Sequence, residues 1–302
     1  MGEILENILS TKICLSSLFD ALSFFCNLDI MPELPEVETV KIFLRENVVK
    51  KKTLSIKIQN ENLRFKVSKK IESKLRNSTI TNILRRGKYL IFLYENNFSL
   101  LFHLGMTGSF RMQRIKKTRK HDHMIFNVEN NFLIFNDIRK FGFAKLYQKD
   151  QIFQSTHLKH LGPEPLGPDF DIKYFMNHSK RKTNIKSLLM NQSFVAGLGN
   201  IYCSEILYDS RIHPTREVSS LRDNELKKII FSTKMVLEKA IKLGGTTIKN
   251  FVVSDEKIGY FKNNLKVYGR ENSHCLRCKG KQKVKKIVQS GRSTFFCNIC
   301  QL

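Results

Sequence analysis

MPELPEVETV, at residues 31–40, reads like the start of a protein although thirty residues precede it. A proline that follows a start methionine becomes the N-terminus when that methionine is removed, and a free N-terminal proline is a secondary amine. An α-amino group has a pKa of about 8, so more of it is neutral near pH 7 than of a lysine side chain. The Pro32 amine can therefore attack an aldehyde-like carbon and form a Schiff base, with Glu33 beside it for proton transfer. The same residues also fit a plain helix start, because proline and acidic residues are favoured in the first turn.

Residues 1–30 contain two short apolar runs, 13–19 and 22–26, which suggest a signal peptide. The flank before them carries Glu3 and Glu6 with only Lys12 as a base, and no clean small-x-small cleavage site follows. A start codon assigned upstream of Met31 is the simpler explanation, so we expect residues 1–31 to be absent from the working protein. If they were retained, the Pro32 nitrogen would be a tertiary amide and could not act as a nucleophile.

The charge of the chain points to a polyanionic partner. The 302 residues are enough for two domains, and they carry a net charge of +25 with a pI near 9.8. Nucleic acid is favoured over an acidic membrane surface. AT-rich coding would explain some of the lysines but not their clustering. No apolar run is long enough to span a bilayer. Seven cysteines, four of them in a metal-like pattern, indicate a reducing compartment rather than a disulfide framework.

Hydrophobic periodicity divides the rest of the chain into two parts. Alternation and strand-length apolar runs, with glycines between them, mark residues 53–147 and predict a β-sandwich packed with the N-terminal helix. The segment 160–169 is dense in proline and glycine and is the best linker. Beyond it, helical spacing predicts helices at 171–178, at 185–190, from about 200 onward and at 223–242. The expected fold class is α+β.

The cysteines near the C-terminus give the strongest signal that comes from spacing alone. Two Cys-x2-Cys pairs are separated by residues 279–296, and they comprise Cys275, Cys278, Cys297 and Cys300. Two thiolate pairs at such a spacing predict one tetrahedral, structural Zn²⁺ site with no position left for a catalytic water. The residues between the pairs are rich in lysine with no acid, and a basic hairpin suits a DNA groove.

Taken together, these motifs resemble bacterial formamidopyrimidine-DNA glycosylase, the enzyme that removes 8-oxoguanine and ring-opened purines. The resemblance starts with PELPEVET at residues 32–39 and extends to the end of the chain. It implies an N-terminal β-sandwich flanked by helices, then a helical helix–two-turn–helix domain with a zinc-finger β-hairpin. The corresponding boundaries are 32–160 for the catalytic domain, 161–262 for the DNA-binding domain and 266–300 for the zinc finger.

The resemblance also assigns roles to single residues. Pro32 corresponds to the nucleophile and Glu33 to the acid and base. Lys88, in Arg-Arg-Gly-Lys-Tyr-Leu at 85–90, corresponds to the general acid for β-elimination. Arg292, near the Ser-Gly-Arg-Ser turn at 290–293, corresponds to the arginine of δ-elimination.

Further residues match the family's DNA contacts. Met106 follows a strand on a glycine-rich turn, and with Arg139 and Phe141 it matches the set that fills the space left by a flipped-out base. His121, Asn200, and Lys182 or Arg181 match phosphate and DNA contacts; the Gly-x-Gly-Asn turn at 197–200 also offers helix N–H groups to an anion. His121 and His123 flank Asp122 as a metal site would, but a third ligand is missing. The loop 254–261 matches the segment that folds over the extruded base.

The sequence thus predicts a bifunctional enzyme of base-excision repair that excises oxidised purines from damaged double-stranded DNA. It would cleave the abasic strand by β,δ-elimination through a Schiff base on Pro32. We expect a monomer in the cytoplasm, associated with the nucleoid, with no membrane partner. One alternative is an endonuclease VIII-like glycosylase for oxidised pyrimidines. Another is a zinc-dependent DNA-binding protein without catalysis, which applies if Pro32 is not exposed; an RNA-associated protein explains only the charge.

Overall fold

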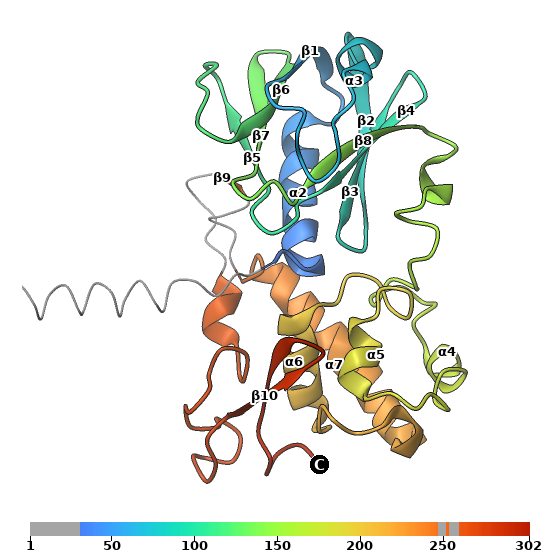
Figure 1. Ribbon diagram of the computed structural model, residues 1–302, viewed down its shortest axis with the longest axis vertical. Coiled ribbons are helices and arrows are strands. Elements are labelled where there is room, and N and C mark those ends of the chain that lie inside the picture. Colours follow the sequence, from blue (N-terminus) through green and yellow to red (C-terminus); the bar gives the residue numbers. More distant parts are fainter. Residues whose placement is uncertain (1–30, 247–251, 254–259) are drawn as a thin grey trace, which may run out of the picture. The chain divides into compact units, whose positions relative to one another are not determined.

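A computed structural model describes residues 31–246, 252–253 and 260–302 (Figure 1). The extension 1–30 and most of the loop 254–261 therefore lie outside the described residues. The first element is helix α2, Leu34–Val48, with Pro35 in its first turn, as predicted for this stretch. Its buried residues Val37, Val40, Leu44 and Val48 recur at helical spacing and face the core.

Eight antiparallel strands follow α2. They are β1 (Lys52–Ile58), β2 (Ser78–Arg86), β3 (Tyr89–Tyr94), β4 (Phe98–His103), β5 (Ser109–Gln113), β6 (Asp122–Val128), β7 (Asn131–Asn136) and β8 (Phe143–Gln148). The short helix α3, Lys70–Lys74, lies between β1 and β2, and the 3₁₀ turn η1, Ile152–Gln154, follows β8. The hydrogen-bonded order of the described strands is β8-β4-β3-β2-β1-β6-β7-β5-β9, in which β9, Val252–Val253, pairs parallel to β5.

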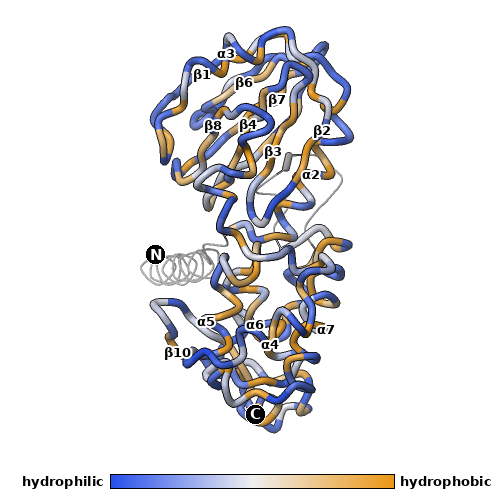
Figure 2. Tube along the Cα trace, turned by 90° about the vertical axis from the view of Figure 1, so that its right-hand side faces the viewer, coloured by the Kyte–Doolittle hydropathy of each residue, from blue (hydrophilic) through white to orange (hydrophobic). Residues whose placement is uncertain are grey.

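The predicted β-sandwich is confirmed by the way the two halves of this strand order share one core. The register shifts between Thr53 and Ser55 in β1, which pairs with β2 on one side and β6 on the other. Phe102 of β4 lies 5.1 Å from Phe110 of β5 and 5.3 Å from Phe135 of β7, ring centre to ring centre. Figure 2 shows hydrophobic segments along the strands and hydrophilic stretches in the loops around them.

Helices form the second half of the chain. They are α4 (Ile172–Met176), α5 (Ile185–Met190), α6 (Asn200–Ser210), η2 (Val218–Ser220), α7 (Asp223–Lys242) and η4 (Tyr260–Asn264). The bounds of α5 and α7 are those predicted, whereas α4 ends two residues earlier than predicted. The predicted linker 160–169 is bound to the end of β2, because Glu164 accepts hydrogen bonds from Arg85, Arg86 and the Gly87 N–H.

The C-terminus ends in a hairpin of β10, Lys285–Gln289, and β11, Arg292–Phe296. Its turn is therefore Ser290–Gly291, and Arg292 is the first residue of β11 rather than part of the turn. Positive φ angles at Ser290 and Gly291 fit a tight hairpin connection. None of the helices in the described part of the chain is long and apolar enough to cross a bilayer.

Candidate active site and nucleic-acid interface

Glu33 is held at the N-terminus of helix α6. Its carboxyl oxygens accept hydrogen bonds from the backbone N–H groups of Ile201 (2.9 Å) and Tyr202 (3.3 Å). A Cβ at Gly199 would lie 2.4 Å from this carboxyl group, so only glycine allows the approach. The sequence predicted that these helix N–H groups would be offered to an anion. The acidic group that they bind is Glu33 of the same chain.

Burial raises the pKa of Glu33 to about 7, against the opposing effect of the Lys88 charge. The side chain of Glu33 is only 3% exposed, and desolvation disfavours its ionised form. Two backbone hydrogen bonds and Lys88 favour the ionised form but do not outweigh burial. A carboxyl group that titrates near neutral pH can both donate and accept a proton, which is the property expected of a general acid and base.

Glu36 fixes the segment that carries Pro32. Its buried carboxyl accepts hydrogen bonds from the N–H of Glu33 (3.0 Å), the hydroxyl of Tyr202 (2.7 Å) and the N–H of Thr246 (2.8 Å). The Leu34 N–H donates to the Gly197 carbonyl at 3.0 Å. Pro32, itself buried, therefore lies in a segment bound to the loop before α6 and to the end of α7. The sequence analysis did not single out Glu36.

Lys88 lies at the turn between β2 and β3. Arg85, three residues before it, is paired with Glu38 of α2 (2.7 Å) and with Glu164 (2.6 Å), so the turn is held from both sides. A Cβ at Gly87 would lie 3.5 Å from the Gly197 nitrogen, and the Gly197 carbonyl accepts from the Leu34 N–H, so the turn that carries Lys88 adjoins the segment of Pro32 and Glu33.

Lys186 is a site residue that the sequence analysis missed. It lies in α5 and is 1% exposed, and its ammonium group donates to Asn200 Oδ1 at 2.6 Å and to Thr294 Oγ1 at 2.5 Å. Desolvation by burial lowers its pKa to about 8. The only sequence signal was a lysine inside the otherwise apolar helix 185–190. Its partners tie it to the start of α6, where Glu33 is bound, and to strand β11, which Arg292 begins.

Asn200 connects the turn before α6 with the C-terminal hairpin. Its Nδ2 donates to the Ser293 carbonyl at 2.8 Å, while its Oδ1 accepts from Lys186. Arg292, next to Ser293, is exposed. The structure therefore brings Glu33, Lys186, Asn200 and the start of β11 together, although they are far apart in the sequence.

The predicted gap-filling residues lie on two neighbouring turns of the sandwich. Met106, between β4 and β5, is half-buried and not the fully exposed side chain that a glycine-rich turn predicts. Arg139 and Phe141, between β7 and β8, are exposed, and the Arg139 guanidinium lies 5.0 Å from the centre of the Phe141 ring. Arg181 and Lys182 are exposed just before α5, and His121 is half-buried just before β6.

Asp122 and His123 are engaged in protein contacts rather than arranged around a metal. Asp122 pairs with Arg111, and His123 Nε2 lies 2.7 Å from the Asp137 carbonyl oxygen. Within the described part of the chain, groups of three or more metal-ligand side chains are limited to the four cysteines. The possibility of a metal at residues 121–123 gains no support.

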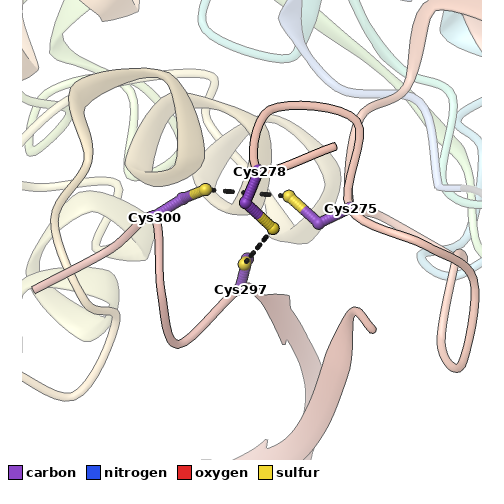
Figure 3. A group of neighbouring side chains, drawn as sticks. All are labelled: Cys275, Cys278, Cys297 and Cys300. Atoms are coloured by element: carbon purple, nitrogen blue, oxygen red, sulfur yellow. Dashed lines mark hydrogen bonds between the residues drawn. The ribbon is translucent and has the colours of Figure 1, made fainter. Parts of the chain in front are cut away.

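The four predicted cysteines form one cluster (Figure 3). The sulfur atoms of Cys275 and Cys300 are 3.7 Å apart, and those of Cys278 and Cys297 are 3.9 Å apart. A tetrahedral site with metal–sulfur bonds of about 2.3 Å requires sulfur atoms about 3.8 Å apart. The cluster can therefore hold a metal ion. The Tyr208 hydroxyl, 3.4 Å from Cys275 Sγ, ties it to α6.

The chain is similar in sequence to known proteins. The sequence profile of the formamidopyrimidine-DNA glycosylase N-terminal domain matches residues 31–144, and the profile of its H2TH domain matches residues 161–252. The formamidopyrimidine-DNA glycosylase of Rickettsia felis is 44% identical over 90% of this chain and 98% of its own length. That of Rickettsia bellii is 42% identical over 90% of this chain and 99% of its own length.

Solved structures agree with the sequence relatives. A Lactococcus lactis Fpg mutant in complex with DNA containing Fapy-dG gives a TM-score of 0.83 at 39% identity, over 89% of this chain and 99% of that one. Wild-type Lactococcus lactis Fpg in complex with DNA containing an oxidised pyrimidine gives a TM-score of 0.82 at 39% identity, with the same coverage. The resemblance inferred from the motifs is confirmed: the chain belongs to the formamidopyrimidine-DNA glycosylase family.

Proposed function

We propose that this chain is a bifunctional enzyme of base-excision repair, which excises oxidised purines from duplex DNA and then cleaves the abasic strand. Family membership supplies the reaction class. The observation that carries the residue assignment is the convergence on one site of Glu33, with Pro32 beside it, Lys88 and Arg292. Glu33 is bound at the start of α6, the turn that carries Lys88 lies against Gly197 just before α6, and Asn200 of α6 binds Ser293, next to Arg292.

The Pro32 nitrogen must be a free amine for this reaction. We propose that the working chain begins at Pro32, and the start of the family match at residue 31 supports this. The amine then attacks C1′ of the damaged nucleotide, so that a nitrogen–carbon bond forms and the bond from C1′ to the base breaks. Glu33, whose pKa is raised to about 7 by burial, provides the proton that the sugar needs as its ring opens.

Strand cleavage follows from the iminium that joins Pro32 to the sugar. The iminium acidifies the adjacent C2′ proton, and loss of that proton expels the 3′ phosphate by β-elimination. A second elimination expels the 5′ phosphate. We assign the proton transfers of the first elimination to Lys88, whose turn adjoins the segment that carries Glu33. Arg292, the first residue of β11 after the hairpin turn, would bind the second leaving phosphate.

Zinc is the metal we propose for the cysteine cluster. Four thiolates with sulfur–sulfur separations of 3.7 and 3.9 Å match its tetrahedral preference. The ion would hold the hairpin that carries Arg292. The fixed hairpin in turn positions Ser293 and Thr294 against Asn200 and Lys186.

DNA binding would use basic and polar residues together with the two gap-filling turns. His121, Asn200, Arg181 and Lys182 are proposed to contact phosphates, and Met106, Arg139 and Phe141 to fill the gap after the damaged base rotates out. Residues 32–160, 161–262 and 266–300 are the proposed sandwich, helix–two-turn–helix and zinc-finger units. A monomer in the cytoplasm, associated with the nucleoid, fits these roles.

A second candidate substrate class is oxidised pyrimidines, because the Lactococcus lactis Fpg was crystallised with DNA containing one. Cleavage of duplexes with 8-oxoguanine opposite cytosine and with thymine glycol separates the two classes. We expect faster cleavage of the 8-oxoguanine duplex by the chain that begins at Pro32. A preference for thymine glycol would replace the purine assignment by the endonuclease VIII-like one.

The same assay tests the requirement for a free amine. A chain that retains residues 1–31 should bind both duplexes and cleave neither, because its Pro32 nitrogen is an amide. Cleavage at the normal rate by a chain whose intact N-terminus is verified by mass spectrometry would contradict the proposed nucleophile. Failure of the Pro32 chain on every lesion would leave the non-catalytic DNA-binding alternative.

A further inference from the structure

Asp137 lies between the two turns that carry the proposed gap-filling residues. It is fully buried in the loop after β7, next to the exposed Ile138 and Arg139. One oxygen of its carboxyl group accepts a hydrogen bond from the Thr107 hydroxyl at 2.5 Å, and the other accepts one from the Gly142 N–H at 2.7 Å. Thr107 directly follows Met106, and Gly142 directly follows Phe141. A single buried side chain thus joins the two turns.

The Thr107 hydroxyl extends this connection to Arg139. Its oxygen accepts a hydrogen bond from the Arg139 N–H at 3.0 Å while its hydrogen is donated to Asp137. One threonine side chain therefore fixes the backbone at Arg139, and its own backbone carries Met106 on the other turn. Valine has the same shape as threonine but can neither donate nor accept here.

The main chain of Asp137 fixes the surroundings of both turns. Its N–H donates to the His121 carbonyl at 3.1 Å, and its carbonyl oxygen lies 2.7 Å from His123 Nε2. The proposed phosphate contact His121 is therefore tied to the same residue as the gap-filling turns. The backbone groups and the carboxyl group of Asp137 all have partners, so this residue cannot shift without moving several elements.

Backbone geometry shows why such fixing is needed. Gly105, before Met106, has φ of +63°, and a Cβ there would lie 2.4 Å from the Gly142 nitrogen. Lys140, between Arg139 and Phe141, has φ of +57°, in the left-handed region that disfavours residues with a side chain. The backbones of the two turns pack against each other in conformations that would be unfavourable in an isolated loop. The hydrogen bonds to Asp137 hold the turns in these conformations.

We propose that Thr107 and Asp137 are positioning residues that lock Met106, Arg139 and Phe141 into one preformed wedge. The inference rests on the proposed gap-filling roles of those three residues. A rigid wedge enters the base stack without first losing conformational entropy, so its side chains act together rather than one by one. The locked pair of turns should matter where a stacked, paired base must be displaced. It should matter little where the lesion is already unpaired.

The variants are made in the protein with the N-terminus that it has in its own cells. They are Thr107→Val and its matched control Thr107→Ser, which keeps the hydroxyl. Single-turnover excision is measured on 8-oxoguanine in a fully paired duplex and on the same lesion inside a bubble of mispaired bases. Thr107→Val removes the hydrogen bonds to Asp137 and from the Arg139 N–H, and we expect it to lose at least about tenfold on the paired duplex. On the bubble the loss should stay within about twofold, and Thr107→Ser should restore most of the paired-duplex rate.

A binding measurement makes the test independent of the Pro32 chemistry. A duplex with an abasic analogue and 2-aminopurine as the neighbouring base reports unstacking when the wedge enters. Thr107→Val should give a smaller fluorescence change at saturating protein than the parent or Thr107→Ser. Asp137→Asn, which cannot accept from both Thr107 and the Gly142 N–H, should act in the same direction.

Several outcomes overturn the inference. Equal losses of Thr107→Val on the paired and bubble substrates would mean that Thr107 only stabilises the fold. A lower melting temperature of Thr107→Val with a normal change in 2-aminopurine fluorescence would lead to the same conclusion. If Met106→Ala is impaired on the paired duplex and Thr107→Val is not, the coupling alone is wrong. If Met106→Ala excises normally from the paired duplex and gives a normal fluorescence change, the gap-filling assignment is wrong as well.

Discussion

The segment around Pro32 and the cysteine-bearing C-terminus are fixed in the fold by different kinds of interaction. Glu33 and Glu36 are bound by groups far along the chain: Glu33 by the N–H of Ile201, and Glu36 by the N–H of Thr246. The four cysteines lie within residues 275–300 and can be held by one shared ion. A buried polar network depends on the whole fold, whereas a metal site organises its own neighbourhood. The two regions should therefore fail in different ways.

Loss of the cysteine site should give the largest effect and leave the other region intact. Structural zinc contributes about 10–16 kcal/mol in isolated zinc-finger peptides, more than a two-stranded hairpin can replace. With Cys297→Ser, or after chelation, proteases should cut within residues 279–296 and affinity for DNA should fall about a hundredfold as basic contacts are lost. The melting transition of the sandwich should persist.

Cys203→Ser is the matched control for the cysteine variant, since Cys203 is buried in α6 and outside the cluster. It should leave the hairpin resistant to proteases. A hairpin that stays resistant in Cys297→Ser would show that packing against α6, and not the metal, holds this region.

Glu36→Ala tests the other region and should reduce the free energy of unfolding of the whole chain by about 3 kcal/mol. The change leaves the N–H groups of Glu33 and Thr246 and the Tyr202 hydroxyl without their acceptor. Urea unfolding followed by circular dichroism measures it. Glu46→Ala, an exposed position on the same helix, should change stability by less than about 0.5 kcal/mol. Equal effects of the two variants would show that the hydrogen bonds of Glu36 do not stabilise the fold.

The raised pKa of Glu33 gives a pH dependence of defined sign. Burial raises the pKa from 4.5 to about 7, so the folded chain binds this proton more tightly than the unfolded chain. The stability that this proton contributes is present below pH 4.5 and is lost as the pH rises through 7. Relative to Glu33→Gln, the parent should lose up to about 3 kcal/mol between pH 4.5 and pH 8. Urea unfolding of both proteins across this range measures the difference, and parallel curves would contradict the assignment.

Lys186→Met should have the smallest effect on stability, because it removes a link between the two regions and not a region itself. Asn200 Oδ1 and Thr294 Oγ1 lose their ammonium donor, while methionine fills the same volume without a buried charge. We expect a loss of about 1 kcal/mol, together with faster amide hydrogen exchange in β11. Lys227→Met, on the exposed face of α7, is the control. Unchanged exchange in β11 would show that the hairpin does not depend on this lysine.

The same contrast explains what the sequence could predict. The cysteine cluster, helix α5 at 185–190 and helix α7 at 223–242 follow from patterns within short windows, and all three are present as predicted. Glu33 and Lys88 were found through a family motif. Lys186 and Asp137 were not found as working residues, because their meaning comes from partners elsewhere. Lys186 binds Thr294, 108 residues away, and Asp137 binds Thr107, 30 residues away.

One prediction from the sequence left its partner open for the same reason. The Gly-x-Gly-Asn turn offered N–H groups to an anion, but nothing near residues 197–200 showed that Glu33, 168 residues from Ile201, would occupy them. Spacing identifies a donor site, whereas only the fold identifies which group reaches it.

The role of Pro32 as the nucleophile can be tested by trapping the chain on DNA and mapping the bond between the protein and the sugar. Native protein from its own cells is mixed with an 8-oxoguanine duplex and borohydride, digested, and analysed by mass spectrometry. We expect a sugar remnant on the nitrogen of an N-terminal Pro32. A remnant on Lys88 or another lysine, or cleavage without any adduct by a chain that still carries Met31, would contradict it.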